Sequence, residues 1–499
     1  MTEVKLNNKF TLNDKYNLLE GRIILSGIQA LVRLLLDQNR ADLIKGLNTG
    51  TLVSGYRGSP VGMLDINLMR NKKLIDQHNI KFIPGVNEDL GATLIYGSQM
   101  AGMVSNVKYD GVMGMWYGKA PGVDRSGDIF RHANFLGVGK NGGVLAVAGD
   151  DPSCKSSTLP SQSEPALFDA MMPIFYPGNV QEILDLGRYA YEMSRYSGLW
   201  SGFKIVTDIA DAFGSAIVHP ERIGINIPDF QYNGQPWKHT QNAKLVGHHS
   251  LPTEKEIHLG RIEAAKHFLA SNNINKITVK SENDTIGIIT AGKTYYDIIE
   301  AFDSLGWNDE FLNAKGIRVL KLGATFPVDS NIIKKFSENL NEIFVIEEKR
   351  SFIEMLIKEE IYNYPNKPLI VGKNDEHNQS LIPGYGELTA DDLSKIIFNR
   401  YASRLGVESD NNKINIISEV DNRAYGQSLT SRSMYFCSGC PHNTSTVKLP
   451  EGDSAFGGIG CHLMAMFVDD GKAFGTTHMG GEGAQWAGME PFIEKEHMF

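Results

Sequence analysis

The sequence predicts an α/β protein built from doubly wound parallel sheets. Short apolar runs recur along the chain, and they end in turns rich in glycine or proline; residues 143–148, for example, lead into Gly149-Asp150-Asp151-Pro152. Apolar runs without polar alternation are typical of parallel strands covered on both faces. Glycine supplies 51 of 499 residues, about a tenth against a usual share of about 7%. Such a surplus is expected where many strands pass into helices through tight turns.

Composition and charge narrow the class of protein. Lysine and arginine number 49 and aspartate and glutamate 58, so the net charge is −9, which argues against a nucleic-acid-binding protein. The 42% hydrophobic and 21% charged content is ordinary for a globular chain. The first residues, MTEVKLNNKF, form no apolar leader, and no apolar run approaches the length of a membrane span. We therefore expect a cytoplasmic protein without membrane contact.

The first predicted elements follow this pattern in order. Residues 22–40 are predicted as an amphipathic helix, with Ile24, Ile28, Leu31 and Leu35 on its apolar stripe and Arg33 off it. The next segments are predicted as a strand at 51–53, a turn at 55–60, a helix at 63–73, and strands at 143–148 and 203–207. Together they indicate one α/β domain.

The sequence as a whole divides into five parts. We predict the first α/β domain over 1–220, a connector over 221–283, a second α/β domain over 284–400, a linker over 401–429 and a third unit over 430–499. The second domain is predicted to hold strands at 286–289, 317–322 and 343–346 and helices at 295–305 and 330–340, and the connector a helix at 253–269. The third unit is glycine-rich and too short to bury a core of its own, so we expect the natural protein to continue past Phe499.

Three cysteines form the sharpest motif. Cys437 and Cys440 have Cys-x-x-Cys spacing and precede Pro441-His442, and Cys461 precedes His462. Three thiolates suit an iron–sulfur cluster, or zinc completed by a histidine, and the spacing leaves both open. Unlinked structural thiols are a third interpretation. Four cysteines in a chain of this length do not make a disulfide scaffold.

Charged residues in turns are weaker candidates. Glu88 starts a predicted helix, where a carboxylate ordinarily just complements the helix dipole. Lys119, Asp124 and Arg125 are predicted to form a charged loop that either clamps a carboxylate or is simply solvated. Asp150-Asp151 ends a predicted strand and either binds a cation or caps the next turn.

Taken together, six segments resemble the indolepyruvate ferredoxin oxidoreductases, which are thiamine-diphosphate-dependent 2-oxoacid:ferredoxin oxidoreductases. The segments keep the family's order over nearly the whole chain, and they look most like its long single-chain form. They are Gly55-Tyr56-Arg57-Gly58-Ser59-Pro60, Val86-Asn87-Glu88, Gly149-Asp150-Asp151-Pro152-Ser153-Cys154, residues 436–442, Gly458-Ile459-Gly460-Cys461 and His478-Met479-Gly480-Gly481-Glu482-Gly483.

The resemblance implies a transketolase-like fold and a set of cofactor residues. The three units would be a pyrimidine-binding domain, a domain of the transketolase C-terminal type and the start of a diphosphate-binding domain. Glu88 would bond the cofactor's aminopyrimidine and drive its imino tautomer, which deprotonates the thiazolium ring. The resemblance also assigns cofactor binding to Gly58, Ser59, Gly460, Gly480, Gly481 and Gly483, substrate binding to Arg57, Lys119 and Arg125, and three ligands of a [4Fe–4S] cluster to Cys437, Cys440 and Cys461.

The implied activity is the oxidative decarboxylation of a 2-oxoacid, indolepyruvate or another arylpyruvate, to an acyl-coenzyme A. Electrons would pass through the cluster to ferredoxin, in a homo-oligomer. The family's fourth cluster ligand and its Mg²⁺-binding Gly-Asp-Gly motif would follow Phe499, so we expect this 499-residue piece alone to be inactive. The alternatives are a non-catalytic, zinc-stabilised binding protein and a non-redox thiamine-diphosphate decarboxylase.

Overall fold

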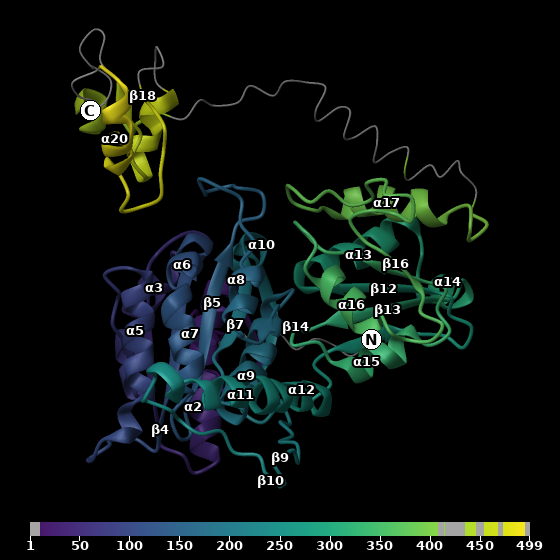
Figure 1. Ribbon diagram of the computed structural model, residues 1–499, viewed down its shortest axis with the longest axis horizontal. Coiled ribbons are helices and arrows are strands. Elements are labelled where there is room, and N and C mark those ends of the chain that lie inside the picture. The colour runs from purple at the N-terminus through teal and green to yellow at the C-terminus, as the bar shows by residue number, and fades with distance from the viewer. Residues whose placement is uncertain (1–9, 408–413, 415–434, 446–453, 468–472, 495–499) are drawn as a thin grey trace. The chain divides into compact units, whose positions relative to one another are not determined.

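The computed structural model describes residues 10–407, 414, 435–445, 454–467 and 473–494. The chain forms two compact units, Met1–Ile414 and Asn415–Phe499. Within the first unit, Figure 1 shows two α/β lobes side by side, coloured purple to teal and teal to green. None of the described helices is long and apolar enough to span a membrane.

The first lobe is built on a seven-stranded sheet with the order β14-β6-β7-β5-β4-β2-β3. All neighbouring strands are parallel except β14, which is antiparallel to β6. The strands are β2 (Thr49–Gly55), β3 (Ile80–Phe82), β4 (Gly111–Lys119), β5 (Gly143–Asp150), β6 (Ile174–Phe175), β7 (Ser201–Val206) and β14 (Ala324–Phe326). Every residue of β5 and β7 is buried, as expected for central strands covered on both faces.

Helices and a β-ribbon surround this sheet. The helices are α1 (Asp14–Asn17), α2 (Gly27–Ile44), α3 (Leu64–Arg70), α4 (Lys72–Gln77), α5 (Glu88–Gln99), α6 (Ala120–Arg125), α7 (Gly127–Leu136), α8 (Glu164–Asp169), α9 (Val180–Ser197) and α10 (Thr207–Asp211). The antiparallel ribbon pairs β1 (Gly21–Ser26) with β8 (Phe213–Val218).

Two expectations about the first lobe are wrong. Residues 22–26 of the helix predicted over 22–40 belong instead to β1, because Ser26 makes a capping box with Gln29 and so starts α2 at Gly27. Arg33, placed off the apolar stripe, is fully buried and pairs with Asp37. The charged loop predicted around residues 118–125 is the end of β4 followed by α6.

The second lobe holds a five-stranded sheet with the order β11-β13-β12-β15-β16. Its strands are β11 (Lys276–Val279), β12 (Ile286–Ala291), β13 (Ile317–Leu322), β15 (Glu342–Val345) and β16 (Leu369–Val371). Its helices are α13 (Gly292–Leu305), α14 (Asp309–Ala314), α15 (Ser330–Ser337), α16 (Ile353–Ile361) and α17 (Ala390–Tyr401). The segment that connects the two lobes in the sequence contains the hairpin of β9 (Gln231–Tyr232) and β10 (Gln235–Pro236), α11 (Leu251–Glu256), a π-helical turn (Ile257–Arg261) and α12 (Ile262–Ser271).

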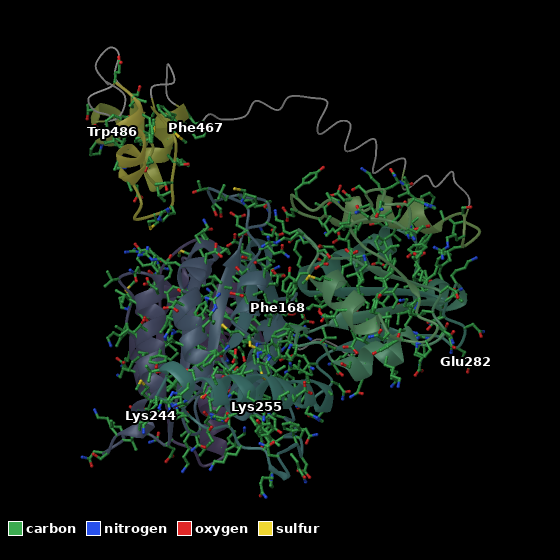
Figure 2. The ribbon with its side chains drawn as sticks, viewed as in Figure 1. Phe168, Lys244, Lys255, Glu282, Phe467 and Trp486 are labelled. Carbon is green, nitrogen blue, oxygen red and sulfur yellow. The ribbon has the colours of Figure 1, made fainter. Side chains whose placement is uncertain are left out.

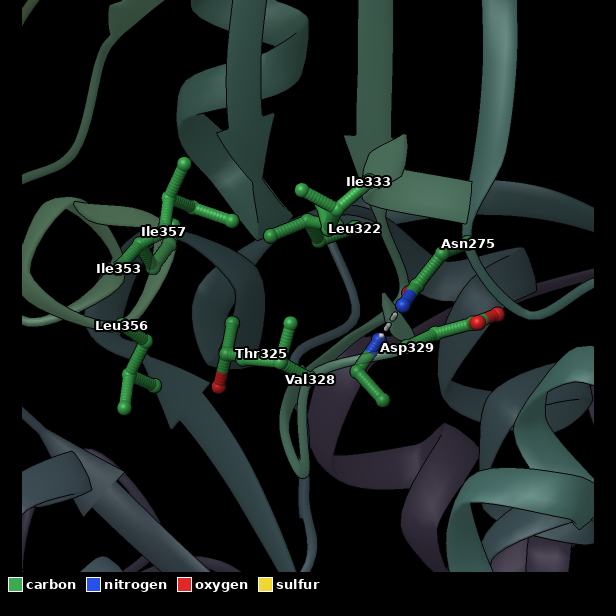
Figure 3. A pocket seen from close by; sticks show the side chains of 10 residues that line it. Asn275, Leu322, Thr325, Val328, Asp329, Ile333, Ile353, Leu356 and Ile357 are labelled. Atoms are coloured by element: carbon green, nitrogen blue, oxygen red, sulfur yellow. Dashed lines mark hydrogen bonds between the residues drawn. The ribbon is translucent and has the colours of Figure 1, made fainter. Parts of the chain in front are cut away.

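The two lobes share one hydrophobic core. Phe168 of α8, labelled between the lobes in Figure 2, packs edge-on against Phe326 and Phe352, with ring centroids 4.9 and 5.8 Å apart. A cavity at this junction, shown in Figure 3, has a volume of only about 10 Å³ and is lined by side chains such as Thr325, Ile333 and Ile357. Because that volume is about one water molecule's worth of space, the junction holds no ligand site there.

The second unit contains short elements. They are α19 (His442–Ser445), the parallel pair β17 (Ala455–Phe456) and β18 (Ala473–Phe474), 3₁₀ turns at Gly460–Phe467 and Glu490–Phe492, and α20 (Ala484–Met489).

Candidate functional site

The carboxyl ends of β2, β4 and β5 bring together most of the first-lobe residues that the sequence singled out. In open parallel sheets this edge is where ligands bind. Arg57, Gly58 and Ser59 follow β2, Lys119 ends β4, and Asp150 ends β5. Glu88 begins α5, and Gly85, three residues before it, donates a backbone hydrogen bond to Gly55, the last residue of β2.

Glu88 lies at the first position of α5. The helix starts there because the Asn87 side chain accepts a hydrogen bond from the Leu90 N–H at 2.9 Å, which caps the helix. The Trp116 indole donates to the Glu88 carbonyl oxygen at 2.9 Å and ties the helix start to β4. No donor among the residues that the structure describes reaches the Glu88 carboxylate, and the side chain is half-buried. The main chain at Glu88 is therefore fixed, whereas its carboxylate is available to a ligand.

A glycine of α6 makes room for this carboxylate. A Cβ atom at Gly122 would lie 2.3 Å from Cγ and 3.0 Å from Oε1 of Glu88, so no larger residue fits without moving Glu88. The helix start itself needs a second glycine, since a Cβ at Gly91 would lie 2.9 Å from the Cα of Gly55. The two glycines are visible in the sequence, but because the residues around Gly122 were predicted as a loop, the contact between Gly122 and Glu88 was not foreseen.

A segment that we call the 151–161 strap packs against the turn that follows β2. Ser156 donates from its hydroxyl to Ser59 Oγ at 2.6 Å, and the Lys119 ammonium donates to the Ser156 carbonyl at 3.0 Å. A Cβ at Gly58 would lie 3.1 Å from the Cβ of Lys119, so this turn lies directly on the end of β4. Burial lowers the pKa of Lys119, and the nearby Asp151 carboxylate opposes that effect.

Asp151 organises the strap. Its carboxylate accepts hydrogen bonds from the backbone N–H groups of Lys155 and Ser156 and from the Ser157 hydroxyl, at 2.6–2.9 Å. Burial alone would raise the pKa of Asp151, but these hydrogen bonds together lower it. The structure therefore favours the capping role that the sequence left open for this residue, because the carboxylate is used within its own loop.

Sequence reasoning missed a buried charge cluster under the strap. Lys204 of β7 donates to the Glu164 carboxylate at 2.5 Å and lies 3.8 Å from the carboxylate of Asp150. All three residues are at most 5% exposed. Burial alone would lower the pKa of Lys204, but the Glu164 carboxylate raises it, while burial raises the pKa of Asp150. A lysine inside the apolar run Phe203-Lys204-Ile205 was the available signal, since a buried charge needs a partner.

The three expected substrate residues differ in availability. Arg125 pairs with Asp89, with Nε 3.1 Å from Oδ1, and both side chains are exposed. Lys119 is bound to the strap. Arg57 is exposed and forms no ion pair within the described residues, so it is the one of these three that has no such partner.

The expected cluster residues lie in the second unit, considered by itself. The Cys440 N–H donates to the Cys437 carbonyl at 3.0 Å, with Gly439 at φ +73°, so the Cys-x-x-Cys segment is a tight turn. The His442 ring packs edge-on against the His462 ring with centroids 5.0 Å apart, which brings the Cys440 and Cys461 segments together. The described residues nevertheless contain no group of three or more Cys, His, Asp or Glu that could hold a metal ion.

Within this unit, the glycine-rich segment around residue 480 contacts the glycine-rich segment around residue 460. Gly460, Gly480 and Gly483 have φ values of +86°, +87° and +84°, which favour glycine. The Gly480 N–H donates to the Glu482 carboxylate at 2.6 Å. A hydrogen bond with the Ile459 backbone is among the interactions that lower the pKa of this carboxylate below its ordinary value. Glu482, which the sequence analysis did not single out, therefore links the segments around residues 459 and 480.

Comparisons with known proteins find relatives of one kind. A family model described as the indolepyruvate oxidoreductase domain matches residues 276–422. The subunit IorA of indolepyruvate oxidoreductase is 26% identical over 407 residues in Thermococcus kodakarensis, covering 78% of this chain and 58% of that protein. The subunit from Pyrococcus horikoshii is 23% identical, covering 75% of this chain and 55% of that protein. The chain thus spans somewhat over half the length of these curated relatives.

Among solved structures, the chain resembles a 2-oxoglutarate:ferredoxin oxidoreductase from Magnetococcus marinus, solved with 2-oxoglutarate, coenzyme A and succinyl-CoA bound. The TM-score is 0.53 at 13% identity, covering 77% of this chain and 66% of that one. This likeness in fold confirms the predicted fold class. The resemblance to the long single-chain form stays a prediction, because the matched relatives are described as subunits. Over most of its length the chain is therefore similar to the subunit IorA of indolepyruvate oxidoreductases, in agreement with the family that its motifs resemble.

Proposed function

We propose that this chain forms the pyrimidine-binding part of a thiamine-diphosphate-dependent 2-oxoacid:ferredoxin oxidoreductase that acts on indolepyruvate or another arylpyruvate. One 2-oxoacid, one coenzyme A and two oxidised ferredoxins would give one acyl-coenzyme A, one CO₂, one proton and two reduced ferredoxins. The names of the curated relatives support this substrate class.

The position of Glu88 carries this proposal. Glu88 is the first residue of α5, and its side chain packs against Gly122 of α6. Its carboxylate receives no hydrogen bond from the described residues. That arrangement fits a carboxylate that accepts an N–H of the cofactor's aminopyrimidine. Bound thiamine diphosphate would supply the carbon nucleophile for decarboxylation, while Glu88 would hold the proton at the pyrimidine ring.

Other residues would bind and orient. The turn of Gly58 and Ser59, fastened to the strap through Ser156, would border the pyrimidine. Arg57 is the cation best placed to bind a 2-oxoacid carboxylate, because Lys119 and Arg125 already have partners. In the second unit, the glycine-rich turns around residues 460 and 480 would let the backbone approach a diphosphate closely.

The test replaces Glu88 by glutamine in the complete gene product. Glu88→Gln keeps the shape of the side chain but cannot take the pyrimidine proton, so 2-oxoacid-dependent ferredoxin reduction should fall about 10²–10⁴-fold. The matched control is Asp89→Asn, which removes a carboxylate from the next residue and loses only the exposed pair with Arg125. Wild-type rates in Glu88→Gln would make Glu88 an ordinary helix-start carboxylate.

A zinc-stabilised protein is the second candidate, favoured by the histidines beside the thiols. His442 Nδ1 lies 3.2 Å from Cys440 Sγ, and His442 packs against His462. Iron and sulfide in the anaerobically purified protein would support the proposed [4Fe–4S] cluster at Cys437, Cys440 and Cys461 and would argue against a non-redox decarboxylase. Cys461→Ala should then lose the visible absorbance, whereas Cys154→Ala, in the first unit, should keep it. Stoichiometric zinc without iron would favour the second candidate.

A further inference from the structure

A second cavity lies at the opposite end of the first lobe from Glu88. It has a volume of about 280 Å³ and is bounded by the end of α2, by α9 and by residues 220–225. Lys45 in its wall lies four residues before β2 begins, so the cavity is near the edge at which the parallel strands start. Its lining residues are Ala41, Ile44, Lys45, Arg188, Pro220, Glu221, Ile223, Gly224 and Ile225.

Arg188 is the unusual member of this lining. Its side chain is only 5% exposed, and its Nε donates to Gln38 Oε1 at 2.9 Å. Its Nη1 makes only long bonds, at 3.4 Å, to the carbonyl oxygens of Asp37 and Pro220. No carboxylate of the described part of the chain lies within ion-pair distance of it. A buried guanidinium without a counter-charge is costly, so an anion supplied from outside would be stabilising.

The neighbouring carboxylates of Glu192, Asp37 and Asp42 act on Arg188 only from beyond ion-pair distance, because other cations hold them. Asp42 and Glu192 pair with Arg195, and Glu192 also pairs with Lys45. Asp37 is shared by Arg33 and Arg40. This network therefore holds five cations and three carboxylates, counted over those pairs and Arg188. Glu221 also lines the cavity, but its side chain is exposed and it forms no ion pair with Arg188.

We propose that this cavity binds a small monocarboxylate with an apolar body. The carboxylate pairs with the Arg188 guanidinium, whose planar fork matches it, and the apolar body lies against Ile44, Ile223 and Ile225. The volume is near the lower end of the roughly 300–1,000 Å³ of small-molecule sites. Because the cavity and Glu88 lie near opposite edges of the sheet, this ligand site is distinct from the site at Glu88.

The experiment is a calorimetric titration of the purified 499-residue chain with three probes. Phenylacetate carries the proposed chemistry, phenylacetamide is its neutral counterpart, and inorganic phosphate is an anion without an apolar body. Because hydrogen bonds to charged groups exceed neutral ones by about 1 kcal/mol, we expect phenylacetate to bind about fivefold more tightly than the amide. Phosphate should bind more weakly than phenylacetate. Equal affinities, or no binding of phenylacetate, would overturn the proposal.

Two matched variants locate the site without disturbing Arg188, which also supports α2. Ile223→Asp places a carboxylate in the lining and should weaken phenylacetate binding about tenfold or more. Ile227→Asp makes the same change four residues later, at a side chain that is 53% exposed and outside the lining, and should leave the affinity unchanged. Equal losses in both variants, or no loss in Ile223→Asp, would contradict this location.

Discussion

Glu88 shows how neighbours decide the role of a single residue. A glutamate at a helix start is common, and nothing in Asn87-Glu88-Asp89 separates it from a residue that only complements the dipole. What sets Glu88 apart is the missing side chain at Gly122, where a Cβ would overlap its carboxylate chain. Asp89, one residue later, instead meets Arg125.

A prediction at the residue scale concerns this glycine. Gly122→Ala forces Glu88 to move, and because small misplacements of catalytic groups are expensive, activity should fall about 10²-fold. The rate of 2-oxoacid-dependent ferredoxin reduction is the measurement, and circular dichroism checks the fold. Gly127→Ala is the control, since its added Cβ would meet only the end of Arg131 at 3.4 Å. Equal rates in the two variants would contradict the role given to Gly122.

At the scale of elements, α16 begins on a buried carboxylate. Glu347 follows β15 and accepts hydrogen bonds from the backbone N–H groups of Phe352, Ile353 and Glu354 at 2.8–3.0 Å. Burial raises the pKa of Glu347 to about 7 from an ordinary 4.5, against the opposing effect of those hydrogen bonds. The helix start therefore depends on the protonation state of one side chain.

The pH dependence of this element has a definite sign. Between pH 4.5 and about 7 the unfolded chain releases the Glu347 proton while the folded chain keeps it, so stability falls as pH rises through this window. Since one pKa unit is about 1.4 kcal/mol, the wild type should lose about 3 kcal/mol relative to Glu347→Gln between these limits. Urea unfolding at several pH values measures the difference. Glu310→Gln, at an exposed position, is the control, and a pH-independent difference for Glu347→Gln would exclude this coupling.

At the scale of the whole molecule, the first unit is one cooperative structure of two lobes. One hydrophobic cluster runs through both lobes, a second cluster belongs to the second lobe, and β14, which follows β13 in the chain, completes the sheet of the first lobe. Near the carboxyl edge of the first sheet, Lys155 of the strap forms ion pairs with both lobes. Its Nζ lies 2.9 Å from Oδ1 of Asp208 in the first lobe and 3.4 Å from Oε2 of Glu387 in the second. The lobes are thus joined by apolar packing, strand pairing and ion pairs.

This continuity predicts one unfolding transition for residues 1–414. Phe168→Ala should lower stability by about 2 kcal/mol, less than the 3–5 kcal/mol of fully buried phenylalanines, because Phe168 is half-buried. Phe213→Ala removes the same ring from a side chain that is 75% exposed and should cost no more than about 0.5 kcal/mol. Differential scanning calorimetry gives both values. Two separate transitions for this unit would show that the lobes unfold independently.

Local pattern was enough to determine much of this architecture. The strand at Ile317–Leu322 agrees with its prediction in both ends, and those predicted at 143–148 and 286–289 are extended by only a few residues. These runs are apolar and bounded by turn residues, so the local signal and the tertiary environment agree. The order of six short motifs likewise pointed to the kind of protein that the comparisons then found as relatives, because motifs in sequence do not depend on contacts.

Only the tertiary structure decided the features that depend on long-range contacts. Residues 21–26 are a strand because β8, about 190 residues later, pairs with them. β4 was missed because its residues, Gly111–Lys119, mix glycines with large side chains, and it is the pairing with β2 and β5 that makes them a strand. The buried pair of Lys204 and Glu164 could not be read from the sequence, nor could the position of Arg188 beside a cavity and away from any carboxylate of the described residues. Both depend on which distant segments the fold brings together and on the space left between them.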